Sequence, residues 1–135
     1  MKFVYLIGIS FLFYYGVSAQ DLTGSWINEL GSVLVIDSIT TDGSIQGVYK
    51  SSSGVDGKTF ELTGAVNQGN TDVIAIAFRV RWEGYSSITS WTGFAHIDSE
   101  GPYIKTMWHL VRPDEKEPWE RIITNSSTFR PYHED

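Results

Sequence analysis

The sequence contains no cysteine among its 135 residues. A chain without cysteine forms no disulfide bond and no zinc site built from thiolates. Its stability must therefore come from the burial of apolar side chains, from backbone hydrogen bonds or from oligomerisation.

Positive charge is also scarce. Ten Lys and Arg residues stand against 16 Asp and Glu residues, which gives a formal net charge of −6, and the basic residues form no cluster. Binding to nucleic acid or to an anionic membrane surface relies on concentrated positive charge. We therefore expect no nucleic acid and no membrane as a partner.

Sequence patterns that carry catalysis or bind metal are missing as well. There is no G-x-S-x-G nucleophile turn, no phosphate-binding glycine loop and no EF-hand pattern. The three histidines, His96, His109 and His133, are not paired at metal-ligand spacing. We therefore expect a protein that is not an enzyme and that holds no metal or cofactor.

The longest apolar run, residues 4–17, is too short and too interrupted by glycine and serine for a convincing membrane span. Lys2 precedes this run and the small-residue sequence Val17-Ser18-Ala19 follows it, which is typical of a secretory signal peptide over residues 1–19. Removal of 19 of the 135 residues leaves 116, enough for one domain. We therefore expect a secreted, extracellular protein, with the cleavage site itself open.

The rest of the chain lacks any helical periodicity longer than about two turns. Short runs rich in Val, Ile, Thr, Tyr and Trp alternate with clusters of Gly, Asp, Asn and Ser, which is typical of β-strands and turns. This alternation predicts one domain over residues 20–130, followed by a polar tail over residues 131–135. The expected strands are Leu22–Asn28, Ser32–Asp37, Ser44–Lys50, Thr59–Ala65, Thr71–Trp82, Ser86–His96, Tyr103–Val111 and Trp119–Phe129.

Eight strands joined in sequence by short turns predict a meander. A meander of this size can close on itself, which leaves no exposed sheet edge. The predicted fold is therefore all-β, an eight-stranded antiparallel up-and-down barrel. The interior of such a barrel is just wide enough for one small ligand.

Strand alternation places tryptophans on the same face as hydroxyl side chains. Ser87, Thr89 and Trp91 share one face of the sixth strand, and Thr106 and Trp108 share one face of the seventh. An unpaired buried hydroxyl costs about 1–3 kcal/mol, so the mixture favours a lined cavity over a plain core. The alternative is that these hydroxyls bond to neighbouring backbone, as they commonly do in β proteins.

Specific motifs within this pattern resemble those of the avidin and streptavidin family. They occur in family order and account for all five tryptophans: Leu22 to Ser32, Gly47-Val48-Tyr49, Leu62-Thr63-Gly64, Val80-Arg81-Trp82, Thr89 to Gly93, Lys105 to Leu110, and Trp119 with Phe129. The resemblance implies an eight-stranded barrel that binds biotin and assembles as a homotetramer. It also implies that Trp26 closes the floor of the barrel.

The resemblance further implies a set of biotin contacts. Asn28, Ser32 and Tyr49 correspond to the donors to the ureido oxygen, a role that an amide and two hydroxyls suit. Ser51 and Ser127 correspond to acceptors of the ureido N–H groups, although the family usually has Asp or Asn where Ser127 stands. Since a neutral hydroxyl accepts more weakly than a carboxylate, we expect weaker ureido polarisation here.

The remaining contacts implied by the resemblance surround the rings and the tail of biotin. Trp82, Trp91 and Trp108 correspond to the walls, Thr89 faces the sulfur, and Leu110 lines the cavity. The backbone N–H of Val55 and the hydroxyl of Ser87 hold the carboxylate, and Trp119 enters from a neighbouring subunit. Met107, Thr124 and Ser126 correspond to positions in a second subunit contact.

Three functions remain open at this point. The first is a secreted, high-affinity biotin-binding protein that sequesters the vitamin, a role taken from the family. The second is a lipocalin-like carrier of another small ligand, and the third is a barrel that retains only a structural role. The sequon Asn125-Ser126-Ser127 is expected to be unglycosylated, because Asn125 shares the strand face of Ser127 and should point inward.

Overall fold

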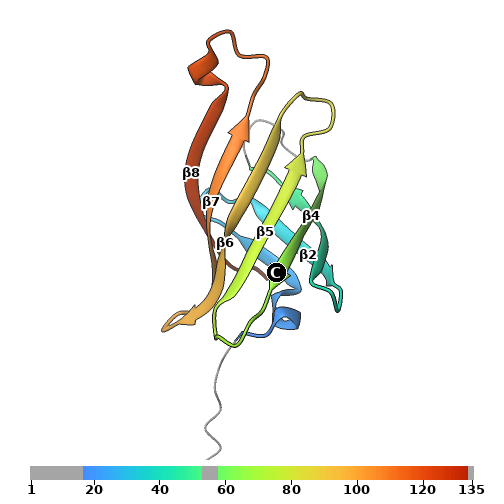
Figure 1. The fold of residues 1–135 in the computed structure, drawn as a ribbon, viewed down its shortest axis with the longest axis vertical. Helices are drawn as coiled ribbons and strands as arrows, with labels where there is room; N and C mark the ends of the chain where they lie inside the picture. The colour runs from blue at the N-terminus through green and yellow to red at the C-terminus, as the bar shows by residue number, and fades with distance from the viewer. Residues whose placement is uncertain (1–16, 53–57, 134–135) are drawn as a thin grey trace, which may run out of the picture.

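A computed structural model of the protein describes residues 17–52 and 58–133. Eight strands follow one another along the chain and wrap around a common axis (Figure 1). Two short 3-10 helices, η1 (Ala19–Leu22) and η2 (Pro118–Glu120), precede β1 and β8. The strands are β1 (Gly24–Ile27), β2 (Val33–Ile39), β3 (Ser44–Lys50), β4 (Thr59–Asn67), β5 (Ile74–Arg81), β6 (Ile88–Asp98), β7 (Gly101–Val111) and β8 (Ile122–Pro131).

Each strand pairs antiparallel with the next, and β8 returns to pair with β1, which closes the barrel. The prediction of an eight-stranded antiparallel up-and-down barrel is therefore confirmed. Pairing is uneven around the ring. Strands β6 and β7 are paired from Ile88↔Val111 to Asp98↔Gly101, whereas β1 and β8 share only Trp26↔Pro131 and Ile27↔Arg130.

Two predicted strand boundaries are wrong in an informative way. Trp119 does not begin the last strand, because it lies in η2, where Pro118 occupies the first turn and has no N–H to give to a ladder. Leu22 does not begin the first strand, because it ends η1 and its carbonyl accepts the indole N–H of Trp26 at 2.9 Å. Of the predicted signal peptide, only residues 17–19 lie within the described part of the chain.

One end of the barrel is filled by apolar side chains. Odd-numbered strands begin at this end and even-numbered strands finish there, so Ile74, Ile104 and Phe129 meet and are fully buried. Leu22 and Trp26 cover the end from η1 and β1, and they are 0% and 3% exposed. This closed end is the packed core. It holds the strands in place, and the opposite ends of the same strands carry the polar interior residues.

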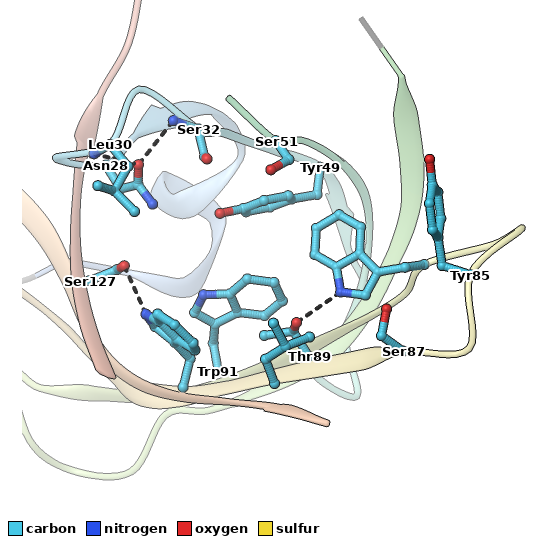
Figure 2. Close-up of a pocket in the computed structure, with 13 residues that line it drawn as sticks. Asn28, Leu30, Ser32, Tyr49, Ser51, Tyr85, Ser87, Thr89, Trp91 and Ser127 are labelled. Carbon is cyan, nitrogen blue, oxygen red and sulfur yellow. Dashed lines mark hydrogen bonds between the residues drawn. The ribbon is translucent and has the colours of Figure 1, made fainter. Parts of the chain in front are cut away.

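At the other end of the barrel, polar and aromatic side chains surround an open space (Figure 2). Here odd-numbered strands finish and even-numbered strands begin, which brings together residues far apart in sequence. Strand β8 reaches this end with Ser127 buried but Asn125 exposed. Asn125 is on the same strand face as Ser127, but the expectation that it lies inside the barrel is wrong, because it stands beyond the depth at which neighbouring strands enclose β8.

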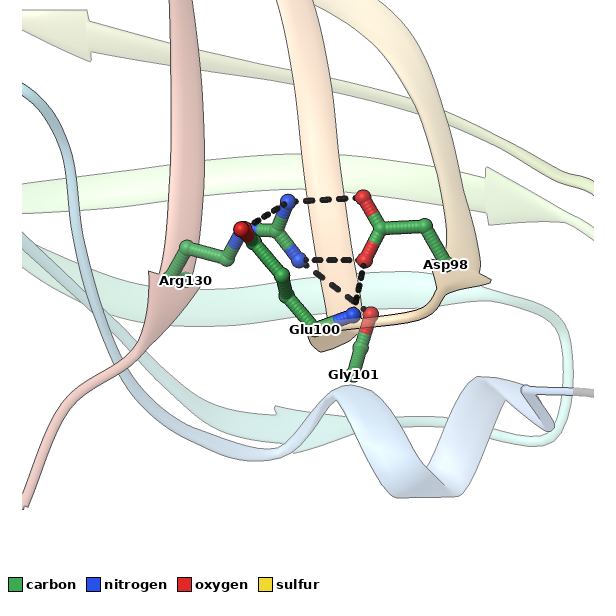
Figure 3. Close-up of polar contacts among 4 residues, drawn as sticks. All are labelled: Asp98, Glu100, Gly101 and Arg130. Carbon is green, nitrogen blue, oxygen red and sulfur yellow. Dashed lines mark hydrogen bonds and ion pairs between the residues drawn. The ribbon is translucent and has the colours of Figure 1, made fainter.

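An ion-pair cluster fastens β8 to the β6–β7 turn at the closed end (Figure 3). The guanidinium of Arg130 donates to both carboxylate oxygens of Asp98, at 2.9 and 2.8 Å, and to the carbonyl of Gly101 at 3.2 Å. Glu100 lies 3.4 Å from the same guanidinium but is 78% exposed. Hydrogen bonds from Arg130 hold the pKa of Asp98 down at about 2.

We expect Asp98→Asn to lower Tm at pH 7 by a few degrees at most, because the pair is exposed to solvent. A depressed carboxyl pKa contributes stability above the unfolded value of 3.8, and this contribution is lost as the pH falls toward 2. Thermal unfolding should therefore show a Tm difference that is constant above about pH 5 and shrinks between pH 4 and pH 2. The matched control Glu100→Gln should change Tm less, and an equal effect of the two substitutions would contradict this assignment.

Candidate ligand-binding site

The open end of the barrel holds a cavity of about 340 Å³. Every strand except β4 contributes to its wall, either directly or through the turn next to it. The lining residues are Asn28, Leu30, Ser32, Tyr49, Ser51, Trp82, Tyr85, Ser87, Thr89, Trp91, Trp108, Leu110 and Ser127. Aromatic walls with a few convergent polar groups are typical of a small-molecule site.

Asn28 lies in the β1–β2 turn and is held in one orientation by backbone donors. Its Oδ1 accepts the N–H groups of Leu30 at 3.0 Å and Ser32 at 2.9 Å. The turn itself closes through the N–H of Gly31, which donates to the Asn28 carbonyl at 3.0 Å. Because the oxygen is occupied on the turn side, the amide NH₂ of Asn28 is directed to the cavity as a donor.

The hydroxyl of Tyr49 completes a group of three polar side chains with Asn28 and Ser32 (Figure 2). Tyr49 is 4% exposed, and burial is the main cause that raises the pKa of its hydroxyl to about 12. Hydrogen bonds to Ser32 and Asn28 oppose this rise, whereas the negative charge of Glu29 adds to it. The phenol therefore stays protonated at physiological pH and remains a hydrogen-bond donor.

Ser32 is positioned from the far side by Ser52, the second residue after β3. The backbone N–H of Ser52 donates to Ser32 Oγ at 3.2 Å, and the Ser52 hydroxyl donates to the carbonyl of Leu30 at 2.6 Å. These contacts attach the start of the β3–β4 connection to the β1–β2 turn. Ser51, just before Ser52, lines the cavity beside Tyr49.

Two hydroxyls at the wall accept hydrogen bonds from tryptophan indoles. Trp82 Nε1 donates to Thr89 Oγ1 at 2.8 Å, and Trp108 Nε1 donates to Ser127 Oγ at 3.2 Å. Each hydroxyl keeps its own proton for donation elsewhere. By contrast, the Thr106 hydroxyl donates to the Ser127 carbonyl at 2.9 Å. The alternative that a hydroxyl bonds to neighbouring backbone therefore holds for Thr106, whereas Thr89 and Ser127 accept from indoles.

The aromatic rings around the cavity are packed against one another rather than free to turn. The Tyr49 ring lies 4.9 Å from the Trp91 ring and 5.9 Å from the Trp82 ring. Trp91 stacks on Phe78 at 5.0 Å with a 19° angle between the planes. Such contacts contribute about 0.5–1.5 kcal/mol beyond burial, so the rings hold one another in place along the cavity wall.

The structure brings eleven of the twelve intrachain residues predicted for the site to this one cavity. The twelfth, Val55, lies outside the described residues. Trp119 does not line the cavity of its own chain and is 75% exposed in η2. What these residues bind stays a prediction at this point.

Sequence reasoning missed two lining residues, Leu30 and Tyr85. Both lie in turns, where strand alternation gives no orientation, and both are largely exposed, at 63% and 50%. Each is a large hydrophobic residue in an otherwise polar turn, and this contrast in the sequence could have indicated a place in the cavity wall. Lys58 approaches Tyr85 at the cavity mouth, with Nζ 5.5 Å from the ring centre.

Within the described ranges, 17–52 and 58–133, no three His, Asp or Glu side chains are grouped closely enough to hold a metal ion. No helix in the same ranges has the length and apolar character to span a bilayer. The residues that line the cavity are neutral donors, neutral acceptors and apolar or aromatic side chains. Such groups can hold a ligand by shape and hydrogen bonding.

Comparison with known proteins gives a consistent result. A sequence model of the avidin family matches residues 17–132. The chain is 33% identical over 104 residues to avidin from Gallus gallus, which spans 70% of this chain and 67% of that protein. It is 32% identical over 104 residues to afifavidin from Afifella pfennigii, which spans 72% of this chain and 60% of that protein.

Solved structures agree with the sequence relatives. The structure of xenavidin superposes with a TM-score of 0.73 at 32% identity and covers 83% of this chain and 98% of that one. A structure of the biotin-binding protein from chicken superposes with a TM-score of 0.74 at 24% identity, which supports the fold alone. It covers 86% of this chain and all of that one.

Proposed function

Because the chain belongs to the avidin family, we propose that it is a high-affinity biotin-binding protein whose ligand occupies the cavity at the open end of the barrel. One observation carries the proposal. Three donors, Asn28, Ser32 and Tyr49, converge at one side of a cavity walled by tryptophans. A cyclic urea fits this arrangement, because its carbonyl oxygen can accept from several donors at once.

The rest of biotin fits the remaining groups. The ureido N–H groups require acceptors, which Ser51 and Ser127 provide at the wall. The apolar ring system packs between Trp82, Trp91 and Trp108, with Thr89 toward the sulfur and Leu110 beside it. The valerate carboxylate lies at the mouth, where we propose the Ser87 hydroxyl as a donor. The second donor that the resemblance implies, the Val55 N–H, belongs to a residue outside the described part of the chain.

We further propose that the protein acts by sequestering biotin outside the cell and that it performs no chemistry on it. A non-enzymatic role accords with a cavity that has tightly packed aromatic walls and, among the described residues, no acidic or histidine side chain in its lining. Secretion rests on the signal-peptide pattern at residues 1–19. Removal of biotin from the surroundings, as a defence, is the use that such binding serves best.

The oligomer proposed is a homotetramer in which Trp119 completes the site of a neighbouring subunit. Supporting this, Trp119 is 75% exposed although it is the most apolar residue of its loop. A row of paired apolar residues, Ile88, Val111 and Ile122, also faces outward across β6, β7 and β8. Exposed apolar residues grouped in this way are typical of subunit contacts.

Titration with biotin tests the proposal directly. We expect tryptophan fluorescence to change on binding, because three tryptophans line the cavity. Biotin at 1,000 times its Kd should raise the free energy of unfolding by about 4.1 kcal/mol. Light scattering on the same samples should report four chains per particle, and absence of any thermal shift would reject the function.

Two control ligands separate biotin binding from a lipocalin-like role. Lipoic acid has a sulfur ring and a valerate tail but no urea, so we expect it to bind far more weakly than biotin. A long-chain fatty acid tests for an apolar carrier and should leave the fluorescence unchanged. Preference for the fatty acid over biotin would favour the lipocalin-like alternative.

Ser127→Asp should slow biotin dissociation by about tenfold, since a carboxylate accepts the ureido N–H roughly twice as strongly as a hydroxyl does. Ser127 is 3% exposed, so the same change should destabilise the ligand-free protein by burying a charge. Dissociation measured by a competitor chase, together with unfolding of the free protein, checks both effects. Dissociation that is unchanged or faster would contradict the acceptor role of Ser127.

A further inference from the structure

The seam between β1 and β8 is the least paired part of the barrel. β1 contributes only two residue pairs to β8, Trp26↔Pro131 and Ile27↔Arg130. Toward the closed end the seam continues, because the N–H of Tyr132 donates to the Ser25 carbonyl at 2.8 Å. Toward the open end β1 gives way to the β1–β2 turn, while β8 stays paired with β7 as far as Val111↔Ile122.

A second hollow, of about 690 Å³, lies on the outside of this seam. It is lined by the β1–β2 turn on one side and by β8 on the other. Four of its residues, Asn28, Leu30, Trp108 and Ser127, also line the ligand cavity. The ligand cavity and the outer hollow therefore adjoin each other at these four residues.

One side chain crosses the seam where the backbone ladder is missing. The carboxylate of Glu29 accepts the backbone N–H of Thr128 at 3.0 Å, a contact between residues 99 positions apart. Glu29 follows Asn28, and Thr128 follows Ser127. The hydrogen bond thus ties the peptide that carries a ureido donor to the peptide that carries a ureido acceptor, and a charged acceptor makes it stronger than a neutral one.

We propose that Glu29 is a positioning residue whose carboxylate closes the β1–β8 seam and thereby slows ligand release from the cavity. The inference rests on the proposed function for its ligand, biotin, but the closure itself is a property of the free protein. Without the Glu29 contact, the Thr128 N–H faces the outer hollow, and Asn28 and Ser127 are free to move apart. The two sides of the urea site then separate more readily.

The first test needs no ligand. Amide hydrogen exchange at Thr128 should be about tenfold faster in Glu29→Ala than in wild type, because the hydrogen bond that protects it is lost. Glu29→Gln keeps an oxygen acceptor and should restore most of the protection. Glu29 is exposed and outside the packed core, so both variants should fold. Equal exchange at Thr128 in wild type and Glu29→Ala would overturn the closure.

The second test measures release. Biotin should dissociate about tenfold faster from Glu29→Ala than from wild type, with little change in the association rate, and Glu29→Gln should lie near wild type. Glu61→Ala, an exposed glutamate on β4, is the matched control and should change neither rate. If Glu29→Ala exchanges faster at Thr128 but releases biotin at the wild-type rate, Glu29 does not control ligand release. If wild type fails to bind biotin, the proposed function is rejected, and the exchange test alone decides whether Glu29 closes the seam.

Discussion

Gly93→Ala is expected to destabilise the barrel strongly, because Gly93 is the described glycine at which an added methyl group approaches a neighbouring backbone atom most closely. A methyl group built on Gly93 overlaps the carbonyl oxygen of Lys105 on β7 and lies 2.8 Å from the Thr106 Cα. Those atoms belong to the backbone of a paired strand, so no side-chain rotation relieves the overlap. Overpacking in a core costs about 1–3 kcal/mol, and a backbone clash lies at or above the top of that range.

Chemical denaturation followed by tryptophan fluorescence measures the effect. The matched control is Gly69→Ala, because a methyl group at Gly69 meets no atom within 4 Å and its backbone has no positive φ. We expect the control to lie within about 1 kcal/mol of wild type, on the stabilising side if anything. A Gly93→Ala midpoint equal to that of the control would show that β6 and β7 are less closely packed than described.

The same close approach explains why glycine recurs in the motifs that carry the family resemblance. Methyl groups at Gly47 and Gly64 would overlap the carbonyl oxygens of Val35 and Ala77, each on the neighbouring strand. Gly47, Gly64 and Gly93 all lie within strands, where glycine is otherwise unfavourable. Their place in the sequence is therefore a packing requirement of the barrel.

Strand alternation and turn residues were sufficient to predict the barrel and its inner face. Ile74, Ile76, Phe78 and Val80 alternate in sequence and are all buried in β5, as expected. Alternation gives the side of a strand but not the depth along the barrel. Asn125 and Ser127 share a face, yet Ser127 is enclosed by its neighbours and Asn125 lies beyond them.

The remaining errors arose where the chain leaves the ladder. Leu30 and Tyr85 line the cavity from turns, whose side-chain directions follow from local hydrogen bonds such as that between the Leu30 N–H and Asn28 Oδ1. Trp119 suits a strand by its aromatic character, but Pro118 beside it sets a 3-10 turn. The Glu29–Thr128 contact joins residues that no local pattern relates.

Asn28→Asp is expected to lower biotin affinity by a factor on the order of 10³–10⁴ while leaving the fold intact. Asn28 Oδ1 accepts the N–H groups of Leu30 and Ser32, and a carboxylate oxygen accepts both equally well. The second oxygen then replaces the amide NH₂ at the cavity. An acceptor faces the ureido oxygen where a donor is required, so the substitution reverses one hydrogen bond and keeps the turn.

Calorimetric titration and thermal unfolding of the same sample separate these two effects. Asn125→Asp makes the same chemical change at an exposed position outside the ligand cavity and should alter neither affinity nor Tm. Affinity within tenfold of wild type for Asn28→Asp would show that Asn28 does not donate to the ligand.

The pH dependence of Asn28→Asp gives a sharper criterion than its affinity at neutral pH. At position 28, which is 8% exposed, burial raises the pKa of an introduced carboxyl group, whereas the hydrogen bonds from the Leu30 and Ser32 N–H groups lower it. Once protonated, the introduced carboxyl group donates a hydrogen bond again. The ratio of the variant's affinity to the wild-type affinity should therefore rise as the pH falls. The carboxylate of biotin titrates with both proteins, so its contribution cancels in this ratio. A ratio that stays constant with pH would mean that the lost affinity comes from a distorted turn rather than from the reversed hydrogen bond.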